Sequence, residues 1–323
     1  MPRIEYTSSH INHQDTKRLI AVVGPTATGK TQLALRLARQ FDGEIVSADS
    51  RQVYRHMDIG TAKPAPEELH QTPHHLINIV NPDEDFSQAQ YQQMAYHAID
   101  NIQKRQRLPL LVGGSGLYVW SVIEGWEIPK VPPDSELRHN LEERASKGEG
   151  DKLYQELLQL DPMAEQNIDR RNIRRVIRAL EVHGSAREPS PRLSQRKTPP
   201  GETLIIGLTT ERKALYRIID QRVDKMIEQG LVEEVRRLVR MGYNLELPAM
   251  SGIGYRQIGL FLNDQASLDS AIQQIKFETH RFVRQQYNWF KLTDSRIKWF
   301  DIQYDVDSEV ETLVEEFLEG KTA

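Results

Sequence analysis

Short runs of apolar residues alternate along the chain with longer segments in which apolar residues recur at helical spacing. The apolar runs cover residues 19–23, 44–48, 76–80, 108–112, 204–208 and 297–300. A run of this length between polar segments is typical of a strand buried on both faces of a parallel sheet. Regular alternation of such strands with helices predicts an α/β fold around a mostly parallel sheet.

The middle of the chain departs from this alternation. Between two proline-rich stretches, residues 128–134 and 188–200, the pattern is helical throughout. The predicted helices cover residues 135–147, 152–160 and 171–183. We therefore predict that residues 128–200 form an inserted all-helical domain with prolines as hinges. Residues 18–127 and 201–323 then form the core; the alternative is that these helices only cover the sheet.

The first apolar run leads into Gly-Pro-Thr-Ala-Thr-Gly-Lys-Thr at residues 24–31, and a helical pattern follows. The order of strand, glycine loop and helix is that of a P-loop, whose backbone amides surround a phosphate chain. We therefore expect a P-loop NTPase-like core of three layers, with a glycine turn in an ordinary strand–helix unit as the alternative. Lys30 is expected to reach the oxygens of a di- or triphosphate, and the Thr31 hydroxyl to bind Mg²⁺. The predicted phosphate-binding residues are Gly24, Thr26, Ala27, Thr28, Gly29, Lys30 and Thr31.

Composition narrows the class of protein. The 323 residues carry a formal net charge of −4, so any binding of nucleic acid has to rest on local basic patches. The chain has no cysteine, which excludes disulfides, thiolate metal sites and a cysteine nucleophile. No apolar stretch is long enough to cross a membrane, and residues 1–17 are polar. We expect a cytoplasmic protein with a disordered lead-in.

The predicted helical insert carries the best candidate for such a patch. Residues 166–200 contain nine basic and three acidic residues, a local net charge of +6. Four arginines fall at helical spacing along one stripe: Arg171, Arg174, Arg175 and Arg178. A row of guanidinium groups suits the phosphates of a nucleic acid backbone. The alternative is an ordinary solvated helix face.

A second candidate patch lies near the C-terminus, where cationic and aromatic residues are interleaved over residues 281–291. Aromatic rings and guanidinium planes are surfaces on which unpaired RNA bases stack. The candidates are Arg281, Arg284, Gln286 and Trp289, and the alternative is that the aromatic residues are the core face of a helix. A glycine-bearing loop with Gly252, Gly254, Tyr255 and Arg256 is a weaker candidate.

Polar residues follow two of the predicted strands. Asp49 and Ser50 come after the run at 44–48, and Ser115 follows the run at 108–112. In α/β sheets the carboxyl ends of the strands hold ligands, so these side chains are expected beside the P-loop. Asp49 is predicted to bind Mg²⁺ or to act as a base, with a turn or helix cap as the alternative.

Several of these segments resemble motifs of the tRNA dimethylallyltransferases, also called tRNA isopentenyltransferases or IPP transferases. The matching segments are residues 24–31, 49–54, 57–64, 111–118, 172–181, 217–224 and 252–256. The last motif, residues 279–290, departs from the family pattern. His280 and Gln285 stand where the family usually has arginine, and Asn288 where it has threonine.

The resemblance implies a reaction and its substrates. Such enzymes transfer a dimethylallyl group from dimethylallyl diphosphate to N6 of the adenosine at position 37 of tRNA, releasing diphosphate. The implied roles are Asp49 as general base, Thr31 with Mg²⁺, and Arg217 and Arg222 on the diphosphate. It implies that a monomer binds the anticodon stem-loop. The implied tRNA-binding residues are Asp49, Ser50, Arg51, Gln52, Ser115, Asn172, Arg174, Arg175, Arg178, Gly252, Gly254, Tyr255, Arg256, Arg281, Arg284, Gln286 and Trp289.

Three alternatives stay open at this point. The first is an enzyme of the same ancestry that prenylates free AMP, ADP or ATP. The second is a P-loop kinase that phosphorylates a small metabolite, and the third is a non-catalytic RNA-binding or nucleotide-switch protein. Whether a nucleoside triphosphate also binds the loop is not decided by the residues.

Overall fold

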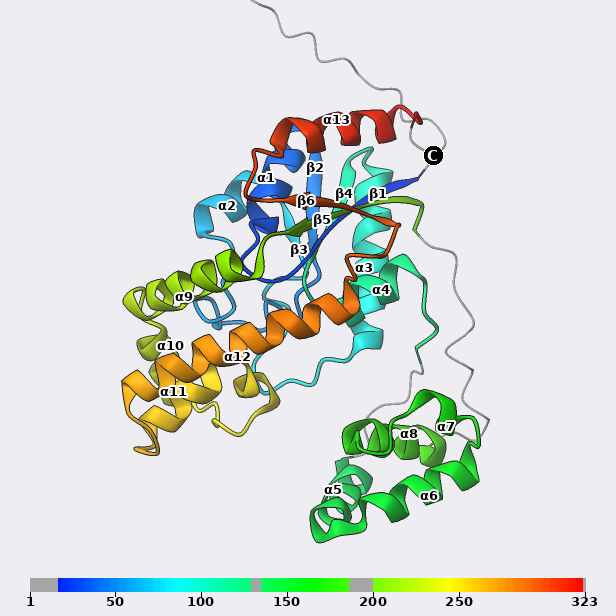
Figure 1. The fold of residues 1–323 in the computed structure, drawn as a ribbon, viewed down its shortest axis with the longest axis vertical. Helices are drawn as coiled ribbons and strands as arrows, with labels where there is room; N and C mark the ends of the chain where they lie inside the picture. Colours follow the sequence, from blue (N-terminus) through cyan, green and yellow to red (C-terminus); the bar gives the residue numbers. More distant parts are fainter. Residues whose placement is uncertain (1–16, 129–134, 186–199, 322–323) are drawn as a thin grey trace, which may run out of the picture. The chain divides into compact units, whose positions relative to one another are not determined.

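The computed structural model describes residues 17–128, 135–185 and 200–321 (Figure 1). Residues 1–16 of the predicted lead-in, and most of both proline-rich junctions, lie outside the described residues. The chain divides into two compact units. Of the described residues, 17–125 and 200–321 form the larger unit, and 126–128 and 135–185 form the smaller one.

The larger unit is built on a sheet of six strands that are all parallel, in the order β3-β2-β4-β1-β5-β6. The strands are β1 (Arg18–Val23), β2 (Gly43–Ser47), β3 (His74–His75), β4 (Leu108–Gly113), β5 (Glu202–Thr209) and β6 (Ile297–Asp301). In the centre of the sheet, Ile20 of β1 lies opposite Leu110 of β4 and Leu204 of β5. The prediction of an α/β fold with a mostly parallel sheet is confirmed.

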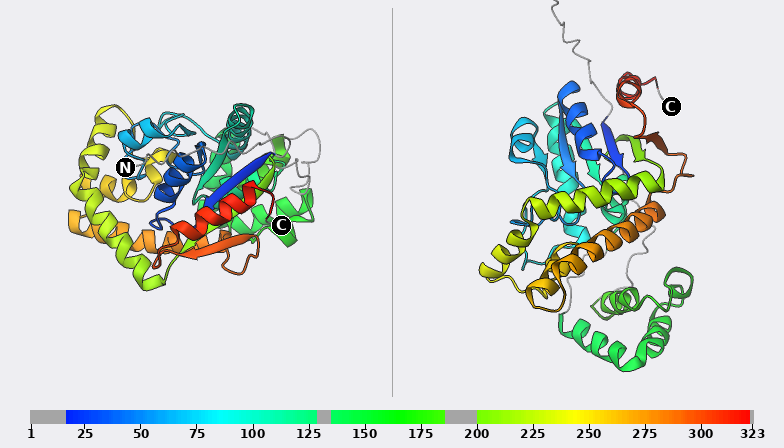
Figure 2. Two further views of the ribbon diagram at one scale, coloured as in Figure 1. Left: turned by 90° about the horizontal axis from the view of Figure 1, so that it is seen from above. Right: turned by 60° about the vertical axis from the view of Figure 1, so that its left-hand side comes forward.

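Helices cover both faces of this sheet and give it three layers (Figures 1 and 2). On one face, α1 (Lys30–Gln40) and α13 (Asp307–Leu318) share a buried apolar cluster with residues of β1, β4 and β5. On the other, α3 (Gln88–Lys104) packs against β2 and β4, and α4 (Gly116–Ile123) packs on α3. Because successive side chains of a strand point to opposite faces, both faces need apolar residues, which explains the uninterrupted runs.

The larger unit contains further helices besides those described above. They are α2 (Pro66–Gln71), α9 (Arg212–Glu228), α10 (Leu231–Arg240), α11 (Tyr255–Leu262), α12 (Leu268–Trp289) and the 3₁₀ turn η2 (Pro248–Ser251). The long helix α12 packs against both α9 and α11, and α10 packs against α9 and α11. In the described ranges no helix has the length and hydropathy needed to cross a bilayer.

The smaller unit has an apolar core of its own. It contains α5 (Ser135–Arg144), the π-helical turn η1 (Ala145–Glu149), α6 (Gly150–Leu160), α7 (Ala164–Asn167) and α8 (Ile173–Ser185). Leu141, Leu153, Leu157 and Val176 from three of these helices are buried together. Gly148 has a φ of +88° in the turn between α5 and α6, a conformation that favours glycine. The predicted helix over 171–183 begins two residues later than expected.

One predicted strand is wrong. The apolar run 76–80 does not continue the sheet beyond β3, because Leu76 and Asn78 adopt φ angles of +64° and +57°. The amides of Asn78 and Ile79 donate instead to the carbonyl oxygens of Gln52 and Val53, at 3.1 and 2.8 Å. The run is therefore a loop held by a distant segment, a contact that hydrophobic patterning does not reveal.

A buried carboxylate anchors the edge of the sheet. Glu44 of β2 is 1% exposed and accepts hydrogen bonds from Arg105, from Arg107 at 2.9 Å and from His75 at 2.7 Å. Burial alone would raise the pKa of Glu44, but the hydrogen bonds from Arg105, His75 and Arg107 hold it at about 2. The carboxylate therefore joins β2 to β3 and to the turn that follows α3.

Replacing Glu44 with Gln should lower the free energy of unfolding by up to about 3 kcal/mol at neutral pH. The reason is that a carboxyl with a pKa near 2 rather than 4.5 stabilises the folded state. This contribution is complete above about pH 4.5 and is lost as the pH falls toward 2, so the two proteins should converge over that range. Urea titrations at stepwise lower pH measure the difference.

Glu202→Gln is the matched control. Glu202 is 62% exposed and lies 3.9 Å from Arg18, so its removal should change stability by less than about 0.5 kcal/mol. A Glu44→Gln protein as stable as the Glu202→Gln protein at neutral pH would contradict the anchoring role.

Candidate active site

The loop between β1 and α1 has the geometry of a phosphate-binding loop. Gly24 has a φ of +133°, and a Cβ there would lie 2.3 Å from the carbonyl oxygen of Leu208. Gly29 has a φ of +80° and begins α1 without a side-chain cap, so the first amides of the helix point toward the loop's hollow. The Thr28 hydroxyl closes the turn by donating to the Pro25 carbonyl at 2.9 Å. Uncapped amides at a helix start suit an anion.

A cavity of about 190 Å³ opens beside this loop. Three kinds of residue line it. The phosphate-loop side is lined by Thr26, Ala27, Gly29, Lys30 and Thr31, together with Arg222 of α9. The loops after β2 and β4 contribute Asp49, Gln52, Gly113 and Gly114. Apolar contacts come from Ile45, Ala62, Pro64, Ile77 and Val112.

The charged groups of the cavity favour an anionic ligand. Lys30 donates a hydrogen bond to the Pro25 carbonyl at 2.6 Å. Burial and, to a smaller extent, the nearby Arg222 lower the pKa of Lys30 to about 7, while Asp49 acts in the opposite direction. Burial also lowers the pKa of Arg222, again opposed by Asp49. Two desolvated cations with one carboxylate leave an excess of positive charge, which a bound anion would balance.

Asp49 lies at the carboxyl edge of the sheet, as predicted, and lines the cavity. Its Oδ1 accepts a hydrogen bond from the amide of Arg51 at 2.8 Å, so it also caps the turn that follows β2. The neighbouring loop after β4 comes close, because a Cβ on Gly113 would lie 2.1 Å from the Ala48 carbonyl oxygen. Ser115 accepts from the amide of Ser50 at 2.9 Å and links the two loops.

Two of the implied tRNA-binding residues, Arg51 and Gln52, are hydrogen-bonded within the protein. Gln52 lines the cavity, but its side chain accepts from the Ser47 hydroxyl at 3.0 Å and donates to the carbonyl of Ala62 at 3.3 Å. Arg51 donates to the carbonyl oxygen of Pro248 at 3.0 Å and so joins the loop after β2 to η2. Both side chains therefore position the cavity wall.

Two predicted RNA contacts are buried, which corrects the sequence-based interpretation. Gln286 is 3% exposed; its amide accepts from the backbone N–H of Thr26 at 2.9 Å and donates to the Gly114 carbonyl at 3.0 Å. Tyr255 is 1% exposed, and its hydroxyl donates to Glu234 at 2.6 Å. Neither side chain is free to meet RNA in this structure, and Gln286 instead joins α12 to the phosphate-binding loop.

The other candidates near the C-terminus divide into buried and exposed groups. Gly252 and Gly254 are buried, and Trp289 is half-buried with its carbonyl accepting from the Trp120 indole at 3.0 Å. The alternative of a core face holds only in part, because Phe290 is buried whereas Phe282 is 38% exposed. The exposed cations are Arg256, Arg281 and Arg284. Of the residues that depart from the family pattern, Gln285 and Asn288 are exposed and His280 stacks on Tyr216, with ring centroids 4.0 Å apart.

The two predicted diphosphate arginines of α9 have different surroundings. Arg222 lines the cavity, whereas Arg217 is exposed and is not among the cavity-lining residues. Five residues along a helix correspond to about 500° of rotation, so the two side chains leave α9 in different directions. The structure brings Arg222 together with Lys30 and Asp49, and it leaves Arg217 outside that group.

The arginine stripe of the smaller unit is shorter than predicted. Arg171 lies before α8 and forms an ion pair with Asp169 at 2.8 Å, and Arg178 lies 3.4 Å from the buried Glu181. Asn172 accepts from the amide of Arg175 at the start of the helix, at 3.3 Å. Arg174 and Arg175 are exposed, and no ion pair involves them within the described residues. Of the four arginines on the predicted stripe, two therefore face acidic partners, and two remain for nucleic acid.

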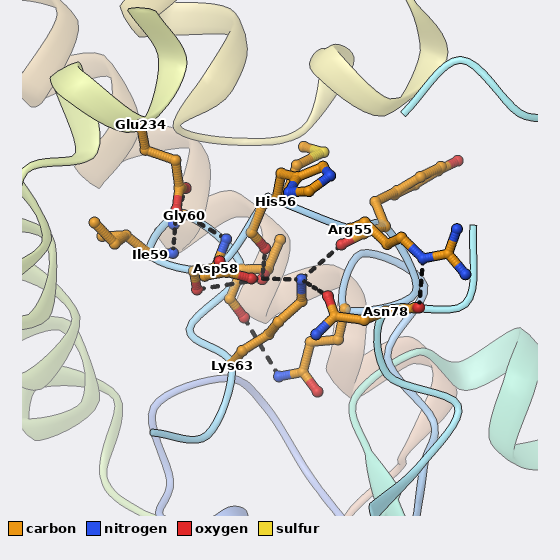
Figure 3. A network of polar contacts seen from close by, with 12 residues as sticks. Arg55, His56, Asp58, Ile59, Gly60, Lys63, Asn78 and Glu234 are labelled. Atoms are coloured by element: carbon orange, nitrogen blue, oxygen red, sulfur yellow. Dashed lines mark hydrogen bonds and ion pairs between the residues drawn. The ribbon is translucent and has the colours of Figure 1, made fainter. Parts of the chain in front are cut away.

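A polar network around Glu234 and Lys63 has no counterpart among the sequence-based predictions (Figure 3). Glu234 of α10 is 5% exposed and accepts from the amides of Asp58, Ile59 and Gly60 at 2.8–3.1 Å. It falls on the stripe of Leu231, Val235 and Leu238, all buried, at helical spacing. A glutamate on an otherwise apolar stripe was the signal that it has buried partners.

The donor set of the cavity was tested for Mg²⁺. No group of three His, Cys, Asp or Glu side chains able to hold a metal occurs in residues 17–128, 135–185 and 200–321. The Thr31 hydroxyl and the Asp49 carboxylate line the same cavity. Mg²⁺ commonly takes one or two protein oxygens and completes its shell with water and substrate phosphates, so these residues fit it.

The chain was compared with known proteins. Residues 52–293 match the family model described as IPP transferase. The tRNA dimethylallyltransferase of Dehalococcoides mccartyi is 48% identical over 300 residues, 93% of this chain and 92% of that protein. The tRNA dimethylallyltransferase of Roseiflexus sp. is 47% identical over 302 residues, 94% of this chain and 99% of that protein.

Solved structures agree with these matches. A tRNA isopentenylpyrophosphate transferase from Bacillus halodurans is 39% identical with a TM-score of 0.69, covering 94% of this chain and 98% of that one. A eukaryotic dimethylallyltransferase acting on tRNA is 25% identical with a TM-score of 0.81, covering 95% of this chain and 81% of that one. The phosphate-binding loop, the carboxylate at the sheet edge and these similarities over most of the sequence lead to one conclusion: the chain belongs to the IPP transferase family.

Proposed function

We propose that this chain transfers the dimethylallyl group of dimethylallyl diphosphate to N6 of the adenosine at position 37 of tRNA, 3′ of the anticodon, and releases diphosphate. The observation that carries the proposal is that Lys30, Arg222 and Asp49 line one cavity in a chain of the IPP transferase family. Relatives named tRNA dimethylallyltransferase, at 47% and 48% identity, support the same reaction.

The cationic side of the cavity suits the diphosphate of the donor. Negative charge grows on the diphosphate as the carbon–oxygen bond breaks, and the loop amides, Lys30 and Arg222 are positioned to stabilise that charge. Mg²⁺ held by the Thr31 hydroxyl and the diphosphate oxygens would neutralise more of it. The contribution of Arg217 stays a prediction.

The carboxylate side of the cavity suits proton removal. N6 of adenine is a weak nucleophile and must lose a proton as it bonds to the allylic carbon, while the electron pair of the broken bond leaves with diphosphate. Asp49 takes this proton. Its hydrogen bond from the Arg51 amide fixes its orientation before the base enters. The adenine has to leave its stack in the RNA to reach the cavity.

The RNA itself requires a larger cationic surface. We assign the anticodon stem-loop to the exposed Arg174 and Arg175 of α8, with Asn172 at the start of that helix. Further phosphate contacts are assigned to the exposed side chains of Arg256, Arg281 and Arg284. The proposal also includes action as a monomer in the cytoplasm, where its tRNA substrate is found.

The proposal is tested with unmodified tRNA, radiolabelled dimethylallyl diphosphate and Mg²⁺, and with Asp49→Asn as the variant. The wild type should label tRNA. The variant keeps an oxygen to accept from Arg51 but cannot take a proton, so the chemical step should slow by roughly 10²–10⁴-fold. The affinity for tRNA should stay unchanged, and single-turnover rates together with filter binding separate the two quantities.

Competing nucleotides distinguish the alternatives in the same assay. Label that enters AMP or ATP rather than tRNA would identify an adenylate prenyltransferase, and phosphate transfer from ATP would identify a kinase. Turnover by Asp49→Asn at the wild-type rate would remove the general base from the mechanism.

Lys30 provides a direct test of the anion site. Its side chain should titrate with a pKa of about 7 in the free protein. Bound diphosphate should raise this pKa toward the ordinary lysine value near 10.4, because an anion favours the charged form. Carbon-detected NMR of labelled lysine follows the titration, with Lys30→Arg to assign the signal. An ordinary lysine pKa in the free protein would contradict the desolvated site.

The basic surface of α8 is tested by salt dependence. Arg174→Ala combined with Arg175→Ala should weaken tRNA binding and reduce the slope of log K against log salt by up to about two phosphate contacts. Arg171→Ala is the matched control, because Arg171 is paired with Asp169 and should change the slope less. An unchanged slope in the double variant would show that α8 does not meet the RNA backbone.

A further inference from the structure

The ammonium group of Lys63 is buried and fully hydrogen-bonded. The side chain is 3% exposed, and its three donors meet the Tyr54 carbonyl at 2.6 Å, the Asp58 carboxylate at 2.8 Å and the Asn78 side-chain oxygen at 2.5 Å (Figure 3). A buried ammonium is costly unless its donors are satisfied in this way. The arrangement therefore fixes three chain segments around one atom.

Two of these segments contribute to the apolar part of the cavity, beside Ile45 and Val112. Ala62 and Pro64, on either side of Lys63, line one wall, and Ile77, next to Asn78, lines another. The bond between Lys63 and Asn78 therefore sets the spacing between the two walls.

Both walls need an external support. Leu76 and Asn78 have positive φ angles, a conformation that side chains disfavour, so the second loop has no regular structure of its own. Arg55 donates to the Asn78 carbonyl at 3.0 Å and adds to the hold of Lys63 on that loop. The segment that leads to the wall at 62–64 is held by Glu234, which accepts hydrogen bonds from the amides at 58–60.

We propose that Lys63 is a positioning residue that determines the length of the prenyl group the enzyme accepts. By joining the wall at 62–64 to the wall at 77–78, it fixes the width of the apolar part of the cavity and limits the donor to five carbons. The inference rests on the proposed prenyl transfer.

The test compares two donors, dimethylallyl diphosphate with five carbons and geranyl diphosphate with ten. With tRNA saturating, kcat and KM are measured for each donor with the wild type and with Lys63→Met, which keeps the apolar stem and removes the ammonium. We define the donor ratio as kcat/KM for dimethylallyl diphosphate divided by kcat/KM for geranyl diphosphate. This ratio should fall by at least about tenfold in the variant, because the rejection of extra methylene groups depends on a cavity wall that does not move. KM for dimethylallyl diphosphate should rise, while inhibition by inorganic diphosphate should be unchanged.

Variants of Asn78 keep the test decisive if Lys63→Met does not fold. Asn78→Ala removes the acceptor on the second wall and should also reduce the discrimination between donors. Asn78→Asp keeps an oxygen for Lys63 and should preserve the wild-type ratio. An unchanged ratio in both Lys63→Met and Asn78→Ala, or in Asn78→Ala alone where Lys63→Met is unfolded, would overturn the role of Lys63.

Lys276→Met is the matched control for loss of a largely buried lysine. Lys276 is 17% exposed, pairs with Asp224 at 2.7 Å and does not line the cavity. Its removal should lower stability without changing the donor ratio; an equal change in the ratio would show a general loosening and would overturn the inference. Failure of the wild type to label tRNA from either donor would refute the proposed function, a result separate from these.

Discussion

The parallel direction of every strand in the sheet is the constraint on which the site depends. Since β2, β4 and β1 are neighbours and run the same way, the three loops that leave their carboxyl ends meet at one edge. The loop after β1 carries Lys30, the loop after β2 carries Asp49, and the loop after β4 carries Ser115. The close approach of Gly113 to Ala48 shows how tightly the last two loops pack. The glycine loop at 24–31 and a carboxylate thus share one cavity because of strand order.

As a consequence, the cavity holds desolvated positive charges that are only partly compensated before any ligand binds. Burial disfavours the charged forms of Lys30 and Arg222, and Asp49 compensates for only part of this. In the proposed reaction, a diphosphate would supply the missing negative charge at the place where charge develops as the bond breaks. The same desolvation that lowers the pKa of Lys30 therefore strengthens its interaction with a bound anion.

The sequence predicted the elements whose signals are local. An apolar run followed by Gly24–Thr31 and a helical pattern is sufficient to locate the phosphate-binding loop, and Asp49 follows from its position after a strand. The prediction of a strand at 76–80 was wrong because hydrogen bonds to the distant residues Gln52 and Val53, rather than the composition of the run, determine its conformation. The prediction for Gln286 was wrong for a similar reason. A polar residue among cations and aromatics was interpreted as an RNA contact. Its side chain instead forms hydrogen bonds with Thr26 and Gly114, which are far from α12 in the sequence.

The residues that escaped prediction share a physical property, since each is a polar side chain satisfied inside the protein. A buried polar group is tolerated only where its partners have fixed positions, so it fixes those partners in turn. Glu234 holds the backbone at 58–60, Lys63 holds the two apolar walls, and Gln286 holds the phosphate loop against the loop at 114. The segment at 57–64, which sequence resemblance marked without a role, therefore contributes to the site through its backbone. Lys30 and Asp49 line the cavity, and these buried contacts fix the segments around it.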